Sequence, residues 1–328
     1  MIISRTPFRA SFLGGSSDLP WYYERYGGAV ISAAIAQYMY VTIHPFFGED
    51  RFRLKYSKLE DVDNIEDIQH PIIRSCLERV PLDGGMEIAS IADVPAGTGL
   101  GSSSSFTVGL LNALYAQNRE IVPPRELAEQ ACDIEINVLK SPIGKQDQYA
   151  AAFGGLNVFR FNQDGTVTSE PVDIQANTIE TLERQLRFYY IGGTRDANRL
   201  LERQNADDDR PRKTKLIAEM VGAVDALRAE LEAGHADLIG PILDEAWQKK
   251  RALTDGITND RIDQVYELAL QSGATGGKLL GAGQTGFLLL CHPDHDSLAR
   301  TLGLKSFPLK IDFTGTTLTE IGAANNVS

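Results

Sequence analysis

A segment of three alternating glycines followed by four serines is the feature that most constrains the fold of this chain. It spans residues 95–105 and reads Pro-Ala-Gly-Thr-Gly-Leu-Gly-Ser-Ser-Ser-Ser. Glycines at alternate positions let a backbone turn tightly and approach an anion without Cβ atoms in the way. The first turn of a following helix directs free N–H groups back at such a loop, and serine hydroxyls there add donors. The segment therefore predicts a phosphate-binding loop.

The residues on either side of this loop argue against a flexible glycine–serine linker. Residues 86–91 alternate as a strand does, and residues 106–116 carry apolar side chains at helical spacing, whereas a linker would be flanked by neither pattern. The loop also differs from two common nucleotide-binding loops. Gly101 follows Gly99 too closely for a dinucleotide-binding fingerprint, and the Gly-Lys-Ser/Thr of a Walker loop is absent, because Leu279 follows Lys278. We expect a phosphate loop of another class.

Length and composition favour a soluble globular protein of two domains, with one large domain as the alternative. The chain has 328 residues, 43% of them hydrophobic, and a net charge of −12. Such a charge repels nucleic acid and anionic membrane surfaces, so neither is expected as a partner, and anionic substrates must be met by local cations or a metal. The three cysteines show no Cys-x-x-Cys spacing, no signal peptide is recognisable, and a cytoplasmic location is expected.

Periodicity and turn residues predict strands and helices along most of the chain. Strands are expected at residues 2–6, 10–13, 29–35, 39–44, 52–56, 86–91, 156–159, 187–191, 286–291 and 309–313, with 29–35 and 39–44 as a pair. Helices are expected at residues 71–79, 106–116, 124–138, 178–183, 213–232, 236–251 and 260–271. Residues 150–155 are expected to form a turn of small residues, and a domain boundary is expected near residue 184.

Three further segments are candidate site elements. They are the turn at residues 14–18, the stretch 145–155, and the glycine-rich stretch 273–286 that joins a helix to a strand. Glycine at such density is costly unless something approaches the backbone closely. A tight turn between packed elements is the alternative explanation for the last of them.

Taken together, these motifs resemble those of the GHMP kinases, the superfamily of galactokinase, homoserine kinase and mevalonate kinase. Residues 95–105 are similar to the family's nucleotide loop Pro-x-x-x-Gly-Leu-Gly-Ser-Ser, apart from serines at 104 and 105 where alanines are usual. Residues 273–286 resemble its C-terminal glycine motif, and residues 6–18 its N-terminal substrate motif. Within the superfamily, residues 7–15 and 145–155 look most like those of the heptose 7-phosphate kinases.

This resemblance implies an α+β fold of two domains, with ATP and a sugar phosphate meeting in the cleft between them. Residues 1–184 would form a ribosomal-protein-S5-like domain with the nucleotide loop, and residues 185–328 a ferredoxin-like domain. The implied reaction uses ATP and Mg²⁺ to phosphorylate the anomeric C1 hydroxyl of heptose 7-phosphate. The 1,7-bisphosphate would then serve the synthesis of nucleotide-activated heptose for surface polysaccharide.

The resemblance also implies roles for individual residues. Asp147 would accept the hydroxyl proton, Arg9 would supply a fixed positive charge beside it, and Ser103 and Glu135 would bind magnesium. For Glu135 the spacing to the catalytic aspartate varies within the family. Nucleotide-binding residues would be Pro95, Gly97, Gly99, Leu100, Gly101, Ser102, Ser103 and Ser104. Substrate-binding residues would be Gly14, Gly15, Ser16, Asp18, Gly154, Arg195, Gly281 and Gly283.

The N-terminal motif departs from that of galactokinase-like members. They continue Gly-Glu-His-x-Asp-Tyr, whereas this chain reads Gly14-Gly15-Ser16-Ser17-Asp18-Leu19. A carboxylate at position 15 would repel a sugar that already carries a phosphate, while glycine and serine leave room and neutral donors. The alternative is that a turn simply requires glycine there.

Several questions stay open at the level of sequence. The cation that would hold the distal phosphate is one of Arg5, Lys145, Arg195 and Arg199, with Arg195 favoured because it follows a Gly-Gly turn. Another sugar 1-kinase of the fucose or galactose type and a non-catalytic sugar sensor are the alternative functions. A dehydrogenase is disfavoured by the glycine spacing, and the oligomeric state is open between monomer and homodimer.

Overall fold

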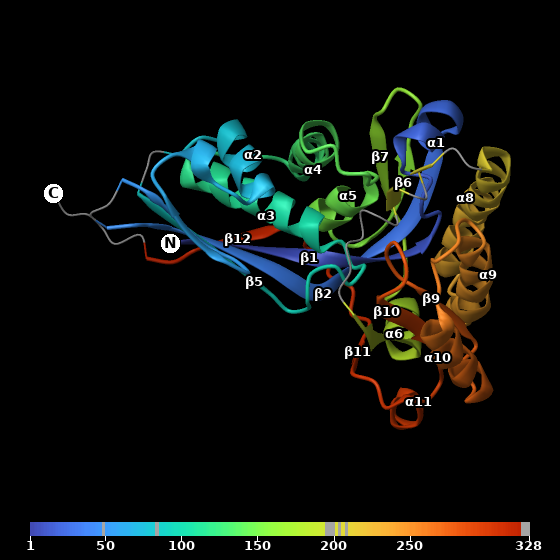
Figure 1. The fold of residues 1–328 in the computed structure, drawn as a ribbon. Helices are drawn as coiled ribbons and strands as arrows, with labels where there is room; N and C mark the ends of the chain where they lie inside the picture. The colour runs from blue at the N-terminus through green and yellow to red at the C-terminus, as the bar shows by residue number, and fades with distance from the viewer. Residues whose placement is uncertain (48–49, 83–84, 194–200, 203–204, 207–208, 323–328) are drawn as a thin grey trace.

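Two β-sheets organise the chain in the computed structural model, which describes residues 1–47, 50–82, 85–193, 201–202, 205–206 and 209–322 (Figure 1). The larger sheet has eight strands in the order β12-β1-β2-β5-β3-β4, and β6 joins it by pairing with β2 and β7. Its strands are β1 (Ile2–Leu13), β2 (Gly28–Pro45), β3 (Phe52–Lys55), β4 (Leu59–Val62), β5 (Met86–Ala92), β6 (Leu156–Phe161), β7 (Val167–Pro171) and β12 (Thr317–Glu320).

The two longest strands correct the prediction of four short ones. β1 continues through Pro7, and the pairing with β2 shifts register between Pro7 and Phe8, which is where a strand tolerates a residue without an N–H. β2 is a single strand because its two halves pair with different neighbours rather than with each other. Its first half pairs with β6 and its second half with β5.

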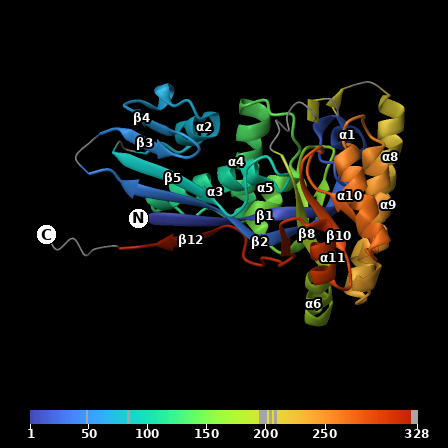
Figure 2. The ribbon, with the colours of Figure 1, turned by 60° about the horizontal axis from the view of Figure 1, so that its bottom comes forward.

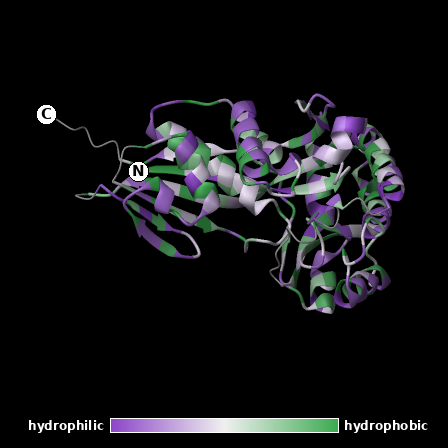
Figure 3. Cartoon of the chain, turned by 45° about the horizontal axis from the view of Figure 1, so that its top comes forward, coloured by the Kyte–Doolittle hydropathy of each residue, from purple (hydrophilic) through white to green (hydrophobic). Residues whose placement is uncertain are grey.

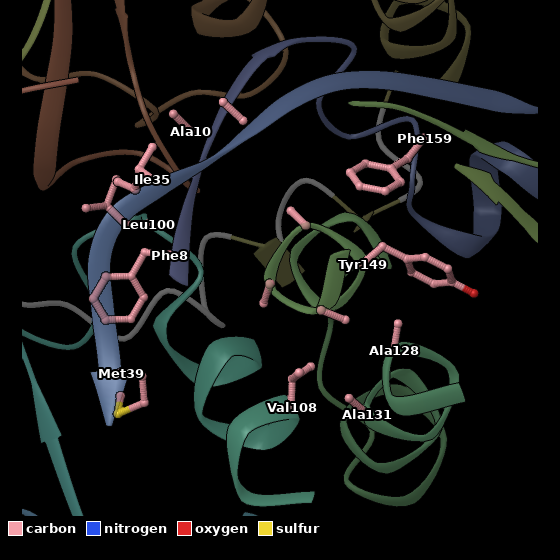
Figure 4. Close-up of a cluster of buried hydrophobic side chains, with 14 of the residues drawn as sticks. Phe8, Ala10, Ile35, Met39, Leu100, Val108, Ala128, Ala131, Tyr149 and Phe159 are labelled. Carbon is pink, nitrogen blue, oxygen red and sulfur yellow. The ribbon is translucent and has the colours of Figure 1, made fainter. Parts of the chain in front are cut away.

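Helices cover one face of this sheet, as Figure 1 shows. They are α2 (Pro71–Arg79), α3 (Ser102–Gln117), α4 (Pro124–Cys132), the π-helical segment Asp133–Val138 and α5 (Gln146–Phe153). The middle of α3 is buried all round, from Ser104 to Leu114, which is typical of a helix inside a core. Figure 4 shows Val108 of α3, Ala131 of α4 and Tyr149 of α5 in the shared hydrophobic cluster.

The second sheet has four antiparallel strands in the order β11-β8-β10-β9. They are β8 (Leu186–Gly192), β9 (Gly276–Leu279), β10 (Gly286–Cys291) and β11 (Ser306–Pro308). Helices lie between β8 and β9 and between β10 and β11, so the order of elements and strands is that of a ferredoxin-like unit. The predicted α+β class with a ferredoxin-like second half is therefore confirmed.

The remaining helices lie around the second sheet or at its junction with the first (Figure 2), except for the short turn Ile65–Asp67, which contacts α2 beside the first sheet. They are α1 (Pro20–Tyr26), the short turn Ile65–Asp67, α6 (Ala176–Gln185), α8 (Arg210–Glu232), the short turn Ala236–Leu238, α9 (Ile239–Arg251), α10 (Asp260–Gln271) and α11 (His295–Leu302). Figure 3 shows hydrophobic residues in both the helices and the strands, and the buried ones among them form two clusters. No helix among the described residues combines the length and apolar composition that a membrane crossing needs.

Two predicted elements differ in kind from the structure. Residues 150–153, expected to be a turn, form the end of α5, because alanine is the strongest helix former and the chain turns only at Gly154 and Gly155. Residues 309–313, expected to be a strand, make one isolated bridge, from Ile311 to Ile35. There the carboxylate of Asp312 accepts hydrogen bonds from the N–H groups of Thr314 and Gly315 and turns the chain.

The division into domains at residues 184 and 185 stays a prediction. In the structure the end of α6 leads into β8, the first strand of the second sheet. The last strand, β12, returns to the first sheet and pairs with β1. The two sheets are thus connected twice, and the first and last described segments of the chain lie side by side.

Candidate active site

A cavity of about 690 Å³ lies where the nucleotide loop meets β1, α5 and the glycine-rich loop before β10. Its volume is within the usual range for a small-molecule site. Of the predicted site residues, the following line it: Arg9, Gly15, Ser16, Asp18, Gly97, Gly99, Gly101, Ser102, Ser103, Asp147 and Gly281. Residues from positions 9 to 281 of the chain therefore meet around one space.

The nucleotide loop has the conformation that its glycines predict. Gly97, Gly99 and Gly101 have φ values of 73°, 82° and 79°, in the left-handed region that other residues rarely adopt. Gly101 is the N-cap of α3, so the free N–H groups of Ser102 and Ser103 lie at the start of a long helix facing the cavity. This arrangement offers an anion both backbone donors and the positive end of the helix dipole.

The second glycine-rich loop packs directly on the first. A Cβ atom on Gly281 would lie 2.2 Å from the Cα of Gly99, and one on Gly99 would lie 2.6 Å from the carbonyl oxygen of Leu280. A Cβ on Gly286 would lie 2.2 Å from the carbonyl oxygen of Thr98. At these three positions glycine is therefore needed because the two loops contact each other. This contact holds the nucleotide loop against the second sheet.

Arg9 and Asp147 form a bidentate ion pair at the floor of the cavity. The Arg9 Nε donates to Asp147 Oδ1 at 2.7 Å and Nη2 to Oδ2 at 2.8 Å, while Nη1 donates to the carbonyl oxygen of Gly99 at 2.6 Å. The Arg9 side chain is 7% exposed and that of Asp147 23% exposed, so the carboxylate presents its free face to the cavity. A Cβ on Gly101 would touch both side chains, which places the pair directly below the start of α3.

Asp18 is a second carboxylate in the cavity, and it is almost fully buried. Its Oδ2 accepts a hydrogen bond from the backbone N–H of Gln146, and the absence of a side chain at Gly144 leaves room for it. Burial, and then the negative charge of Asp147, raises the pKa of Asp18 to about 6. Ionised Asp18 is therefore costly in the free protein, and a polar ligand offering hydroxyl donors would offset that cost.

We expect the substitution Asp18→Asn to stabilise the free protein, more strongly at higher pH. Because the pKa of Asp18 is raised by folding, the cost of its ionisation is absent below the pKa of the unfolded chain and complete above about pH 6. The free energy of unfolding should rise by about 3 kcal/mol at pH 8 and by about half of that at pH 5. Denaturant titrations at the two pH values measure this, and a gain that does not grow with pH would contradict the assignment.

Ser103 and Glu135 provide hard oxygen ligands of the kind that magnesium prefers. Glu135, from the π-helical segment after α4, is buried, and its Oε2 accepts a hydrogen bond from Gln148. Burial raises the pKa of Glu135 to about 7, while Gln148 and the hydroxyls of Ser104 and Ser103 oppose the rise. A buried carboxylate beside two serines of the nucleotide loop fits a magnesium ion shared with phosphates. Among the described residues, no three His, Cys, Asp or Glu side chains gather in a metal-binding group.

Some predicted site residues have structural roles that the geometry makes plain. Gly14 has a φ of 81° and no room for a Cβ against Ala29, so a turn requires glycine there. Gly154 ends α5 and packs against Gly315 in the same way. Leu100 lies in the core, where its carbonyl accepts from the N–H of Arg9, and Ser104 is buried within α3. Two more predicted nucleotide- or substrate-binding residues, Pro95 and Gly283, do not line the cavity. Their carbonyl oxygens accept hydrogen bonds within their own loops.

The cations predicted for a distal phosphate are not brought to the cavity where the structure describes them. Arg5 lies over the ring of Tyr38 on the surface, with Asp312 at 4.0 Å. Lys145 donates to the carbonyl of Gly165 and lies over the ring of Tyr23. Each of these two is engaged by a neighbouring ring and an oxygen acceptor and is not among the residues that line the cavity, and a phosphate contact for either stays a prediction. Arg195 and Arg199 lie outside the described residues.

Two lysines and a cluster of aromatic side chains also line the cavity, although the sequence did not indicate them as site residues. Lys250 of α9 and Lys278 of β9 enter from the second sheet. Tyr56, His70 and Phe106 lie at the other end, with ring centroids 4.7 Å apart for Tyr56 and His70 and 5.3 Å for His70 and Phe106. Only Lys278, which lies within the glycine-rich stretch, carried a signal that could have found it.

Comparisons with known proteins identify the family of the chain. Residues 69–155 match the model of the GHMP kinases N-terminal domain, and residues 227–303 that of the GHMP kinases C-terminal domain. The chain is 30% identical to D-glycero-alpha-D-manno-heptose 7-phosphate kinase of Campylobacter jejuni over 88% of each chain. It is 26% identical to the bifunctional fucokinase/GDP-fucose pyrophosphorylase of Arabidopsis thaliana, over 88% of this chain and 29% of that protein.

Solved structures share the fold over nearly the whole chain. A D-glycero-D-manno-heptose 1-phosphate kinase from Bacteriodes thetaiotaomicron superposes with a TM-score of 0.82 at 24% identity, over 98% of this chain and 100% of the other. Lactococcus lactis galactokinase, in complex with galactose, superposes with a TM-score of 0.74 at 16% identity, over 98% and 95% of the two chains. With two family domains matched in order and a relative of 30% identity along most of its length, the chain belongs to the GHMP kinases and is an ATP-dependent kinase.

Proposed function

We propose that this kinase transfers the terminal phosphoryl group of ATP to the C1 hydroxyl of D-glycero-D-manno-heptose 7-phosphate, giving the 1,7-bisphosphate. The observation that carries the proposal is the Arg9–Asp147 pair, which lies directly against Gly101 at the start of the nucleotide helix. A base placed there can reach a hydroxyl only if that hydroxyl faces the end of the triphosphate. The relative of 30% identity named as a heptose 7-phosphate kinase supports the choice of sugar.

The roles of the residues follow from what phosphoryl transfer requires. The nucleotide loop and the N–H groups of Ser102 and Ser103 would hold the phosphates, and the aromatic cluster of Tyr56, His70 and Phe106 would contact the purine. Each oxygen of Asp147 accepts one hydrogen bond from Arg9 and keeps a second lone pair for the sugar hydroxyl. Arg9 therefore fixes the direction of the carboxylate while Asp147 takes the proton.

The other components orient the substrates. Asp18 would accept hydrogen bonds from sugar hydroxyls, since its buried carboxylate faces the cavity beside Asp147. Ser103 and Glu135 would hold magnesium, which when bound neutralises charge on the phosphate oxygens. The walls of the cavity exclude water from the reacting groups, which reduces hydrolysis of ATP without sugar.

The direct test is a coupled ADP-release assay with heptose 7-phosphate, unphosphorylated heptose, galactose and fucose, each with and without Mg²⁺. We expect magnesium-dependent turnover with heptose 7-phosphate, and a product whose new phosphate is attached to the anomeric carbon by ³¹P NMR. Turnover of galactose or fucose alone would instead favour a hexose 1-kinase, in keeping with the similarity to fucokinase. Absence of ADP release with every sugar would contradict a catalytic role.

Introducing a carboxylate at Gly15 should discriminate against a phosphorylated sugar. The position has space, because a Cβ there would meet only the hydroxyl of Ser11, at 4.0 Å. We expect Gly15→Glu to raise KM for heptose 7-phosphate by about 10- to 100-fold through like-charge repulsion, and to affect unphosphorylated heptose much less. Gly15→Gln, of the same size without the charge, is the matched control. Equal losses for both sugars would show that position 15 does not distinguish them.

A further inference from the structure

Lys278 is a buried lysine in the active-site cavity for which the proposed mechanism has no role. It lies on β9, two residues before Leu280, in a segment where all four residues are buried. Its residue exposure is 5%, and it lines the same cavity as Arg9 and Asp147. Full burial of a lysine is rare unless its amine has a partner, so the position calls for an explanation.

The hydrogen bonds of the Lys278 amine leave it free to bind a ligand. Nζ donates to the carbonyl oxygen of Phe12 at 2.8 Å, and no second acceptor for it is found among the described residues. A protonated lysine has three N–H donors, so two remain for a ligand in the cavity. Lys250 differs, because its Nζ donates to two carbonyl oxygens, of Leu279 at 2.9 Å and of Gly281 at 2.5 Å.

The position of Lys278 along the chain directs it to the phosphate end of the cavity. β9 leads into Leu280 and Gly281, the two residues that touch Gly99 of the nucleotide loop. Arg9 donates to the carbonyl of the same Gly99. Lys278 is therefore anchored on one side to β1, through Phe12, and on the other to the loop that packs on the nucleotide loop.

The charges around Lys278 favour an anion in the cavity. The charged groups that line this part of the cavity are Arg9 from β1, Asp18 from the turn after β1, Asp147 from α5 and Lys250 from α9. Both carboxylates are engaged, Asp147 by Arg9 and Asp18 by the N–H of Gln146. Burial, and then the positive charge of Arg9, lowers the pKa of Lys278 to about 7, and burial lowers that of Lys250 as well. An anion bound between Lys278 and Lys250 would favour the protonated amines and so raise both pKa values again.

We propose that Lys278 binds the terminal phosphoryl group of the nucleotide through its two remaining N–H donors and keeps contact with that group during transfer. Lys250 is a positioning residue that holds the Gly281 loop against Gly99. The proposal rests on the proposed function only in placing the terminal phosphate beside Asp147.

In the transfer step Lys278 stabilises charge and exchanges no electrons. The sugar oxygen forms a bond to the γ-phosphorus, the bond from that phosphorus to the bridging oxygen breaks, and the electron pair stays on ADP. The hydroxyl proton goes to Asp147. The Lys278 ammonium donates to non-bridging oxygens of the moving group and keeps its protons, as expected of a preorganised electrostatic stabiliser.

Binding of AMPPNP and of ADP without sugar tests this proposal independently of the sugar that is used. In isothermal titration with Mg²⁺, Lys278→Met should weaken AMPPNP by about 10- to 100-fold and leave ADP and heptose 7-phosphate unchanged, because only AMPPNP carries the third phosphate. Lys249→Met is the matched control, since Lys249 of the same helix as Lys250 pairs with Glu245 at the surface. It should change none of these affinities.

Proton uptake provides a second readout that needs no variant. At pH 8 the wild type should take up about one proton on binding AMPPNP and less on binding ADP, measured from the binding enthalpy in buffers of different ionisation enthalpy. Lys278→Met should lose that difference. Equal weakening of AMPPNP and ADP, weakening of heptose 7-phosphate alone, or equal proton uptake for both nucleotides in the wild type would each overturn the proposal. Failure of heptose 7-phosphate to turn over would leave these measurements intact.

Discussion

Asp147→Asn is expected to lower kcat by about 10²- to 10⁴-fold, the contribution typical of a positioned general base. Asparagine occupies the same volume but cannot take the proton of the sugar hydroxyl. It also leaves the guanidinium of Arg9, 7% exposed, without its charged partner. Nucleotide binding should persist, because the loop at residues 95–105 is intact, so the loss should fall on kcat rather than on KM for ATP. Steady-state kinetics with AMPPNP binding in parallel measures both.

The matched control for this experiment is Asp61→Asn. Asp61 of β4 forms a similar bidentate pair with Arg53 of β3, at 2.7 Å and 3.2 Å, away from the reacting groups. The control should keep the wild-type kcat. If Asp147→Asn retained more than about a tenth of the wild-type rate, Asp147 would not be the base, given the usual size of this contribution.

Gly281→Ala is expected to lower kcat/KM for ATP by about 10²-fold, although Gly281 need not touch the nucleotide. Its φ is 71°, and a Cβ would lie 2.2 Å from the Cα of Gly99, so the two loops must move apart. Displacement of the nucleotide loop by about 1 Å is enough for a loss of this size, because phosphoryl transfer depends on alignment. Kinetics at varied ATP concentration, together with thermal unfolding, measures the effect.

Gly303→Ala separates the effect of loop contact from that of backbone strain. Gly303 ends α11 with a φ of 61°, yet a Cβ there meets nothing within 4 Å. It should cost about 1 to 2 kcal/mol of stability for the left-handed conformation and leave the kinetics unchanged. Similar kinetics for the two variants would mean that the loop contact is not needed for nucleotide binding.

The parts of the site that could be predicted from sequence are those whose backbone conformation is determined by a short stretch of neighbouring residues. The left-handed turns at Gly97, Gly99 and Gly101 and the helix that follows are of this kind, since glycine and the helix start specify them directly. The Arg9 and Asp147 pairing was expected from resemblance rather than from spacing. It depends on β1 and α5 packing against each other, which short-range patterns do not report.

The differences between sequence and structure have one local origin and one in tertiary context. The glycines after Ala150-Ala151-Ala152 favour a turn for the whole segment, whereas the helix propensity of the alanines themselves extends α5 to Phe153. Arg5 and Lys145 are candidate phosphate ligands by charge alone, and their partners are distant in sequence. Arg5 meets Tyr38 and Asp312, and Lys145 meets Tyr23 of α1 and the carbonyl of Gly165. Lys278 lacks the hydroxyl neighbour of a Walker sequence and is therefore not expected to bind phosphate, yet the ferredoxin-like sheet brings it to the cavity.

A crystal structure of the protein with AMPPNP and heptose 7-phosphate tests the central claim most directly. The account predicts the C1 hydroxyl within about 2.6 to 3.2 Å of an Asp147 carboxylate oxygen, the distance that proton transfer requires. The same structure should place the triphosphate on residues 97–103, with its terminal phosphate above Arg9. A sugar bound with another hydroxyl at Asp147, or a nucleotide bound away from this loop, would contradict the account.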